Sequence, residues 1–197
     1  SCMGGPEGLT PYLDRIAAQG VRFDQARSHA PWTLPSTASM LTSLHPEEHG
    51  AGGRLGRFTT LDAEVETVVK SFRDLGYRTH AIVNVLFLDP KLFGVTRDFE
   101  TVDQQVFETN VDVRAAEATT RAALEWIEAN RDDGPFFLLV HYFDPHCVYA
   151  PPPAFRERWA ATPAAAADVA DSGNSTWSRT ERCPPSCLCA TYGRRGT

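Results

Sequence analysis

The sequence contains no run of about 18 consecutive apolar residues, which is the length that a membrane-spanning helix needs. It also lacks the charged and then apolar start of a secretory signal peptide, and its first residue is Ser1 rather than Met. We therefore expect no membrane span in this chain. We also expect a fragment whose true amino terminus lies upstream, so the cellular compartment stays unknown.

An excess of positive charge is also missing. Lys and Arg number 19 against 25 Asp and Glu, which gives a formal net charge of -6 at pH 7. Nucleic acids and anionic membrane surfaces bind basic faces, so the composition indicates no nucleic-acid partner. A small anionic ester substrate is compatible with this balance, because a few local groups are enough to hold it.

The five cysteines do not form the even set that a disulfide framework needs. Three of them, Cys183, Cys187 and Cys189, lie close together near the end of the chain. A zinc site there would need a fourth ligand and a more regular spacing. The sequence therefore favours accidental clustering over metal binding at these three residues.

Apolar residues recur at helical spacing in several segments, and two of these segments lead directly into strands. Residues 65–75 predict a helix that ends at Gly76, and a strand at 79–83 follows. The same order returns in a helix at 115–130 and an apolar strand, "FFLLV", at 136–140. A helix that leads into such a strand is half of a βαβ unit. The sequence therefore predicts an α/β fold with a mostly parallel sheet, flanking helices and "FFLLV" in the sheet interior.

Two further helices are predicted before these units. The first begins at Thr10 as N-cap, with Pro11 in its first turn, and ends at Gly20. The second covers 36–44 and can begin as early as Leu34. Residues expected to pack are Tyr12, Ile16 and Ala17 in the first helix and Ala38, Met40 and Leu41 in the second, and Val21 and Phe23 are expected to form a short strand between them.

This pattern ends at residue 163. Residues 164–197 have no sustained apolar period and are rich in Ser, Thr, Arg and Cys. Two interpretations fit this segment: a disordered tail, or a stretch that is translated out of frame, which the close cysteines favour. We therefore expect a partial domain at 1–163 and a tail at 164–197.

Thr33 stands at the entrance of the second helix, in the stretch "APWTLPSTAS". A hydroxyl at a helix amino terminus gains from the backbone N–H groups and from the positive end of the helix dipole, which stabilise both an alkoxide and the anion that it attacks. A nucleophile fits that position. The alternative is that Thr33 is only an N-cap and that Trp32 belongs to the core.

A second polar cluster follows the "FFLLV" strand, in "HYFDPHCVYAPPP". Parallel sheets place their active residues after the carboxyl ends of strands. His141, Asp144 and His146 emerge at such a position. We assign structural hydrogen bonding to His141 and Asp144, and a substrate contact to His146.

Several segments, taken together and in this order, resemble the amino-terminal part of a sulfatase, in the alkaline phosphatase superfamily. The segments are "SCMGG", "LTPYLDRIAAQGVRF", "APWTLPSTASMLTSLHPEEHG", "LGYRTHAIVN" and "FFLLVHYFDPHCVYAPP". In that family a "TPNLDRLA" segment precedes the nucleophile, a helix that ends in "HG" follows it, and a "DPH" element comes much later. The resemblance covers Ser1 to Pro153 and implies that 1–163 is a partial sulfatase-like catalytic domain of alkaline-phosphatase-like fold.

The resemblance assigns roles to four residues. Thr33 stands where sulfatases have the Cys or Ser that becomes formylglycine, and Thr37 replaces the arginine of the same signature. Asn84 stands where the family has a substrate-binding lysine, and Leu86 replaces a histidine two residues later. His146 matches the substrate-binding histidine of the "DPH" element. The resemblance therefore implies Thr33 and His146 as catalytic residues and Thr37 and Asn84 as substrate-binding residues, with Asn84 able to donate a hydrogen bond.

The resemblance also implies a divalent metal, Ca, Zn or Mn, with Thr33 as one ligand. A threonine hydroxyl is a weak acid, so a bound cation or a strong base must help it to ionise. The acidic metal-binding segments of the family are not found in this sequence. We therefore expect a parent enzyme that hydrolyses sulfate or phosphate esters through Thr33 and a fragment that is itself inactive. The alternative is a non-catalytic pseudoenzyme or anion-binding module of the same fold.

Overall fold

A computed structural model describes residues 2, 4, 7–54, 57–105, 114–144, 146 and 152–160. The described elements fall into two compact units. Helices α1 (Pro11–Gln19) and α6 (Pro153–Ala160) belong to one unit, and all other elements belong to the second. The expected tail at 164–197, with its three cysteines, lies outside the described residues, so the boundary at 163 and the nature of the tail stay predictions.

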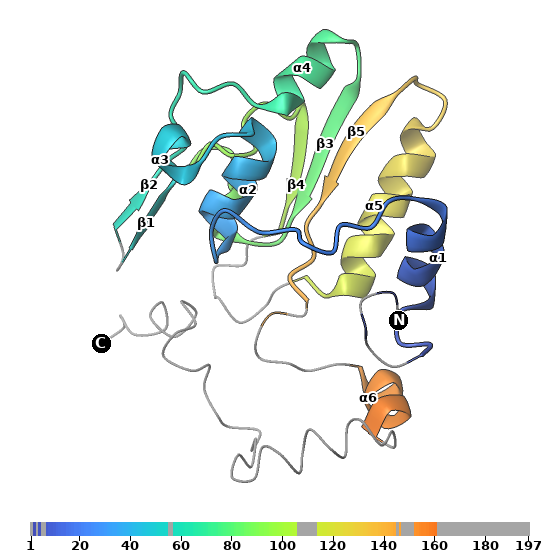
Figure 1. The fold of residues 1–197 in the computed structure, drawn as a ribbon. Coiled ribbons are helices and arrows are strands. Elements are labelled where there is room, and N and C mark those ends of the chain that lie inside the picture. The colour runs from blue at the N-terminus through green and yellow to red at the C-terminus, as the bar shows by residue number, and fades with distance from the viewer. Residues whose placement is uncertain are drawn as a thin grey trace, which may run out of the picture. The chain divides into compact units, whose positions relative to one another are not determined.

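A parallel sheet forms the centre of the second unit. It has the order β4-β3-β5, with β3 (Arg78–Val83) between β4 (Thr101–Gln104) and β5 (Phe136–Val140) (Figure 1). Val83 pairs with Gln104 on one side of β3, and Ile82 pairs with Val140 on the other. The parallel pairing of "FFLLV" with the strand at 79–83 is confirmed. Its expected interior position is wrong for the described sheet, because β5 is at one edge and its side chains are partly exposed.

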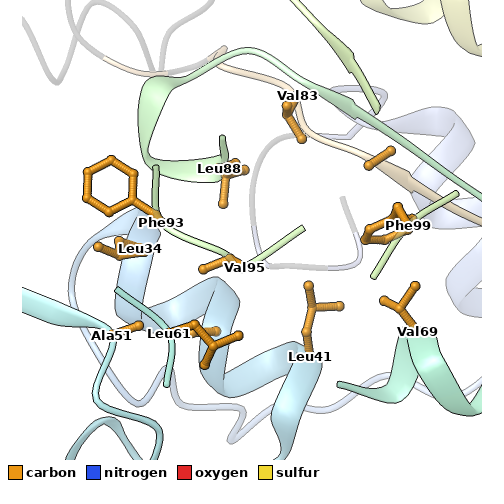
Figure 2. Packing of buried hydrophobic residues seen from close by; sticks show 12 residues of the cluster. Leu34, Leu41, Ala51, Leu61, Val69, Val83, Leu88, Phe93, Val95 and Phe99 are labelled. Carbon is orange, nitrogen blue, oxygen red and sulfur yellow. The ribbon is translucent and has the colours of Figure 1, made fainter. Parts of the chain in front are cut away.

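Side chains alternate between the two faces of this sheet, and each face has its own cover. Helix α5 (Ala116–Asn130) packs on one face, where the Trp126 ring stacks on His80 with centroids 4.9 Å apart. The opposite face contributes Ala81 and Val83 to the hydrophobic core. Helices α2 (Thr33–Thr42) and α4 (Val68–Asp74) supply Leu34, Leu41 and Val69 to that same core (Figure 2). Helix α2 also contributes Ala38. The sheet therefore separates an α5 face from an α2 face.

The helix predicted at 36–44 is confirmed as α2, but its packing differs from the expectation in one respect. Ala38 and Leu41 are buried, whereas Met40 is 65% exposed. Positions 34, 38 and 41 lie on one side of a helix with 3.6 residues per turn, and position 40 lies off that side. Met40 therefore points away from the core.

The first predicted helix is also confirmed, as α1, but its packing and the strand after it are not. Tyr12 and Ile16 are 71% and 64% exposed, and α1 buries no residue. Thr10 makes no side-chain cap and instead donates its hydroxyl hydrogen to Asp14. Val21 and Phe23 are exposed and do not form a strand. Alternation alone does not make a strand when the segment has no pairing partner.

No helix among the described residues has the length and apolarity to cross a membrane.

A short hairpin follows the helix that carries Thr33. Helix α3 (Pro46–His49) leads into β1 (Gly52–Arg54), which pairs antiparallel with β2 (Arg57–Thr59). Gly53 has φ +118°, and a Cβ atom there would lie 2.0 Å from the carbonyl oxygen of Arg57. Both the backbone conformation and the close approach of the partner strand require glycine.

The two glycines of β1 give a matched test of this constraint. Gly53→Ala is expected to lower the free energy of unfolding by about 1–3 kcal/mol, because it adds both strain and a clash. A Cβ atom at Gly52 would have no neighbouring atom within 4 Å, and Gly52 has no positive φ. Gly52→Ala should therefore leave stability unchanged or raise it by up to about 1 kcal/mol. Urea denaturation measures both, and equal effects of the two variants would contradict the hairpin geometry.

Candidate active site

The carboxyl edge of the parallel sheet gathers residues from four elements. Asn84 follows β3, Gln104 ends β4, and His141 follows β5. His141 continues the hydrogen-bond ladder between β3 and β5, because its backbone N–H donates to the carbonyl of Ile82 at 2.8 Å. The amino end of α2 lies toward the same edge (Figure 1), since the Trp32 ring contacts Phe87, in the 3-10 helix η1 (Leu86–Leu88) after β3, with centroids 5.3 Å apart.

Thr33 is the first residue of α2, and the amino end of this helix has no side-chain cap. Trp32 occupies the N-cap position in extended conformation and makes no capping bond. The N-cap alternative for Thr33 is therefore wrong. Trp32 packs against Phe58 and Phe87, which confirms its assignment to the core. The uncapped N–H groups and the helix dipole remain available to an anion.

Thr37 lies four residues after Thr33, so the two threonines share one side of α2. Both are partly exposed, in contrast to the buried Leu34 and Ala38 on the core side. This placement lets Thr37 and Thr33 face the same ligand. Substrate binding by Thr37 stays a prediction.

A buried histidine fixes the far side of α2. His49 is fully buried; its Nδ1 accepts a hydrogen bond from the Ala51 N–H at 3.1 Å, and its Nε2 lies 3.0 Å from the Ser39 hydroxyl. Since Nδ1 is the acceptor, Nε2 carries the proton and donates to Ser39. Burial lowers the pKa of His49 below 6.5, so the ring is held neutral.

Asn84 joins three elements through its side chain. Its Nδ2 donates to the Thr119 hydroxyl of α5 at 3.0 Å and to the His141 carbonyl after β5. The carbonyl can only accept, which fixes the orientation of the amide. The Thr119 hydroxyl donates its own hydrogen to Ala115, so it too accepts from Asn84. Both Asn84 hydrogens are thus used within the protein, and only its Oδ1 could meet a substrate.

The segment after β5 is held to the start of α5. An oxygen of Asp144 accepts a hydrogen bond from the Ala116 N–H at 3.0 Å, which agrees with the structural role assigned to Asp144. The Tyr142 hydroxyl lies 2.9 Å from that of Thr120.

His146 is exposed, and its ring stacks on Phe143 with centroids 4.4 Å apart. Burial, with His146 nearby, lowers the pKa of His141. Whether His146 and Thr33 face one cleft stays a prediction.

Four buried side-chain atoms among the described residues have no hydrogen-bond partner, and all belong to this edge. They are Asn84 Oδ1, Gln104 Nε2, Arg114 Nε and His141 Nδ1. Arg114 precedes α5, and its terminal nitrogens bind both oxygens of Asp103 at 2.7 and 2.8 Å. Buried polar groups without partners are rare in folded proteins. Sequence reasoning missed Gln104 and Arg114, because their placement depends on strand register rather than on a local motif.

A divalent metal would need acidic or imidazole ligands in addition to Thr33. In the described part of the chain, no group of three His, Cys, Asp or Glu side chains is placed to hold one. A divalent cation with Thr33 as one ligand stays a prediction.

The structure thus defines an α/β domain with a threonine-bearing helix at the carboxyl edge of a parallel sheet. Residues 1–178 match the family described as Sulfatase, and the chain belongs to this family.

Curated relatives have sequences similar to this chain. An N-acetylglucosamine-6-O-sulfatase of Bacteroides thetaiotaomicron is 27% identical over 165 residues, which cover 78% of this chain and 29% of that protein. A human N-sulphoglucosamine sulphohydrolase is 28% identical, and the match covers 73% of this chain and 28% of that protein. A mouse steryl-sulfatase is 36% identical over 89 residues, 41% of this chain and 14% of that protein. The chain therefore spans less than a third of these relatives.

A solved structure shares the fold. It is described as BT4656 in complex with its substrate D-glucosamine-2-N,6-O-disulfate, and the match covers 74% of this chain and 31% of that chain. The TM-score is 0.58 at 23% sequence identity. The expected sulfatase-like α/β fold is thereby confirmed.

Three histidines whose pKa values are lowered by burial should make the free energy of unfolding fall in acid. The pKa values of His49, His80 and His141 are lowered by burial, so below pH 6.5 the unfolded chain takes up protons before the native chain does. This stability is complete above pH 6.5 and is lost as the pH falls toward the lowered native pKa values, by up to about 1.4 kcal/mol per pH unit for each ring.

Urea denaturation between pH 7.5 and 5 measures this loss. His49→Gln should make the loss shallower, because one buried imidazole is gone. His29→Gln is the control, since the His29 ring is exposed and its removal leaves all three buried rings in place. If the free energy of unfolding depended on pH in the same way in the unchanged chain and in His49→Gln, the lowered pKa of His49 would be contradicted.

Asn84→Asp tests the amide contacts at nearly constant shape. The carboxylate would face the His141 carbonyl and could not donate, so we expect a loss of about 3 kcal/mol in the free energy of unfolding. Gln105→Glu makes the same amide-to-carboxylate change at an exposed position and should cost little. Equal stability of the two variants in denaturation would show that the Asn84 bonds do not hold the edge together.

Proposed function

We propose that this chain supplies the nucleophile side of a hydrolase that acts on sulfate or phosphate esters, with Thr33 as nucleophile. The observation that supports this most is the position of Thr33, at the uncapped amino end of α2 in a chain of the sulfatase family. A hydroxyl there is next to backbone N–H groups that can stabilise the charge of the transferred group.

The reaction divides into two displacements. The Thr33 oxygen forms a bond to the sulfur or phosphorus atom, its proton passes to a base, and the bond to the ester oxygen breaks. His146 would give a proton to the leaving alcohol. Water then attacks the same atom and releases Thr33 and the inorganic anion. A bound divalent cation would supply the acidity that the Thr33 hydroxyl lacks, from ligands that the described residues do not provide.

Two features bear on the substrate. The relatives are named for sulfated amino sugars and a steryl sulfate, which supports a sulfate ester. Thr33 cannot become the aldehyde that true sulfatases form from Cys or Ser, which favours phosphate mono- or diesters. The competing function is an anion-binding module without turnover, which the uncapped end of α2 would also serve.

Substitution of Thr33 tests the proposal. In a form of the protein that also carries the acidic metal-binding segments, Thr33→Ala should lower hydrolysis of 4-nitrophenyl sulfate or phosphate by roughly 10³-fold or more, with Ca²⁺, Zn²⁺ or Mn²⁺ present. Thr33→Ser keeps a hydroxyl and should retain measurable activity.

Two outcomes would contradict or redirect the proposal. Undiminished hydrolysis by Thr33→Ala would exclude the threonine as nucleophile. Anion binding with no turnover in any form would favour the binding module. The 197-residue chain by itself is expected to bind the anion without turnover.

A further inference from the structure

Strand register places Gln104 and His141 on the α2 face of the sheet. Gln104 pairs with Val83, and the ladder between β3 and β5 continues from Ile82 and Val140 to put His141 beside Val83 on the other side. Paired residues of parallel strands present their side chains to the same face. Val83 packs in the core with α2, so Gln104 and His141 flank it on the face that α2 covers.

Each of these two side chains carries a buried atom with unused hydrogen-bonding capacity. Gln104 Nε2 is a donor, and His141 Nδ1 is a donor in one tautomer of the neutral ring. A buried polar atom without a partner costs about 1–3 kcal/mol. Both residues keep part of their surface exposed, so a change of rotamer can present them to a ligand.

Two of the positions that the family resemblance singled out, Asn84 and Leu86, do not provide such donors. Asn84 is on the α5 face and uses both amide hydrogens on Thr119 and His141. Leu86 has no polar side-chain atom. Besides Thr37 and His146, a substrate oxygen near the amino end of α2 could therefore be bound by other donors on the α2 face.

We propose that Gln104 and His141 form a subsite that binds the oxygens of the sulfate or phosphate group next to Thr33. The proposal rests on the proposed function and names two substrate-binding residues for it. Neighbouring strands are about 4.8 Å apart, so the two Cα atoms lie roughly 10 Å apart across β3. Their side chains can reach inward to two oxygens of one tetrahedral anion, and the amino end of α2 lies toward the same edge of the sheet. In this subsite the neutral donors of Gln104 and His141 take the place of the lysine and histidine that the family has at the positions of Asn84 and Leu86.

Inorganic sulfate is the probe for this subsite, and its dissociation constant is measured by calorimetry on the 197-residue chain. Gln104→Met and His141→Phe keep approximate shape and remove the donor. Each should weaken sulfate binding by about 10- to 100-fold, the usual effect of losing a hydrogen bond to a charged group. Without sulfate, Gln104→Met should be at least as stable as the native chain, because it removes an unpaired buried amide.

Gln105→Met is the matched control, since Gln105 is the exposed neighbour of Gln104, and it should leave sulfate affinity unchanged. Sulfate affinity that is unaffected by both Gln104→Met and His141→Phe would overturn the subsite, and so would a chain that does not bind sulfate. A loss of sulfate-free stability in Gln104→Met, with affinity intact, would make Gln104 structural and also overturn it. Thr33→Ala separates the two proposals, because it should abolish turnover in the form that carries the metal-binding segments and should keep sulfate binding in the 197-residue chain.

Discussion

The parallel pairing of β3 with strands on both sides is the constraint on which the rest of the structure depends. It fixes which residues of β4 and β5 lie beside Val83, and it places the three strand ends in one row. The side chain of Asn84 then ties the end of β3 to the end of β5 and to α5. Without these contacts the residues at the carboxyl edge would have no fixed relation to one another.

The α2 face adds a second constraint, because the helix that carries Thr33 is held by its buried residues. Leu34, Ala38 and Leu41 pack against the sheet, and the neutral His49 bonds to Ser39 on the same helix. The other side of α2, with Thr33 and Thr37, is left partly exposed. Packing therefore fixes the position of the helix, while Thr33 at its amino end keeps part of its surface exposed.

Much of the fold could be predicted from the sequence, because helix 65–75, strand 79–83 and strand 136–140 have strong apolar periods that tertiary packing does not override. The expectation for Val21 and Phe23 was wrong, because alternation carries no information about a pairing partner. The edge position of β5 could not be foreseen either, since a fully apolar strand indicates burial without indicating strand order.

Candidate site residues could be named from the sequence only where they lie in a continuous motif. Thr33 and His146 belong to such motifs, whereas Gln104 becomes visible only through its register with Val83. The donor role expected of Asn84 rested on its match to a family position and on its residue type, and the structure shows that its hydrogens are already used. In most of a folded chain, buried polar groups find partners and local rules agree with the fold. At this edge four buried atoms do not, which is where a ligand has the most to contribute. Unsatisfied polar groups and the family's usual positions therefore point to different residues at this edge, and the proposed subsite follows the first of these two signals.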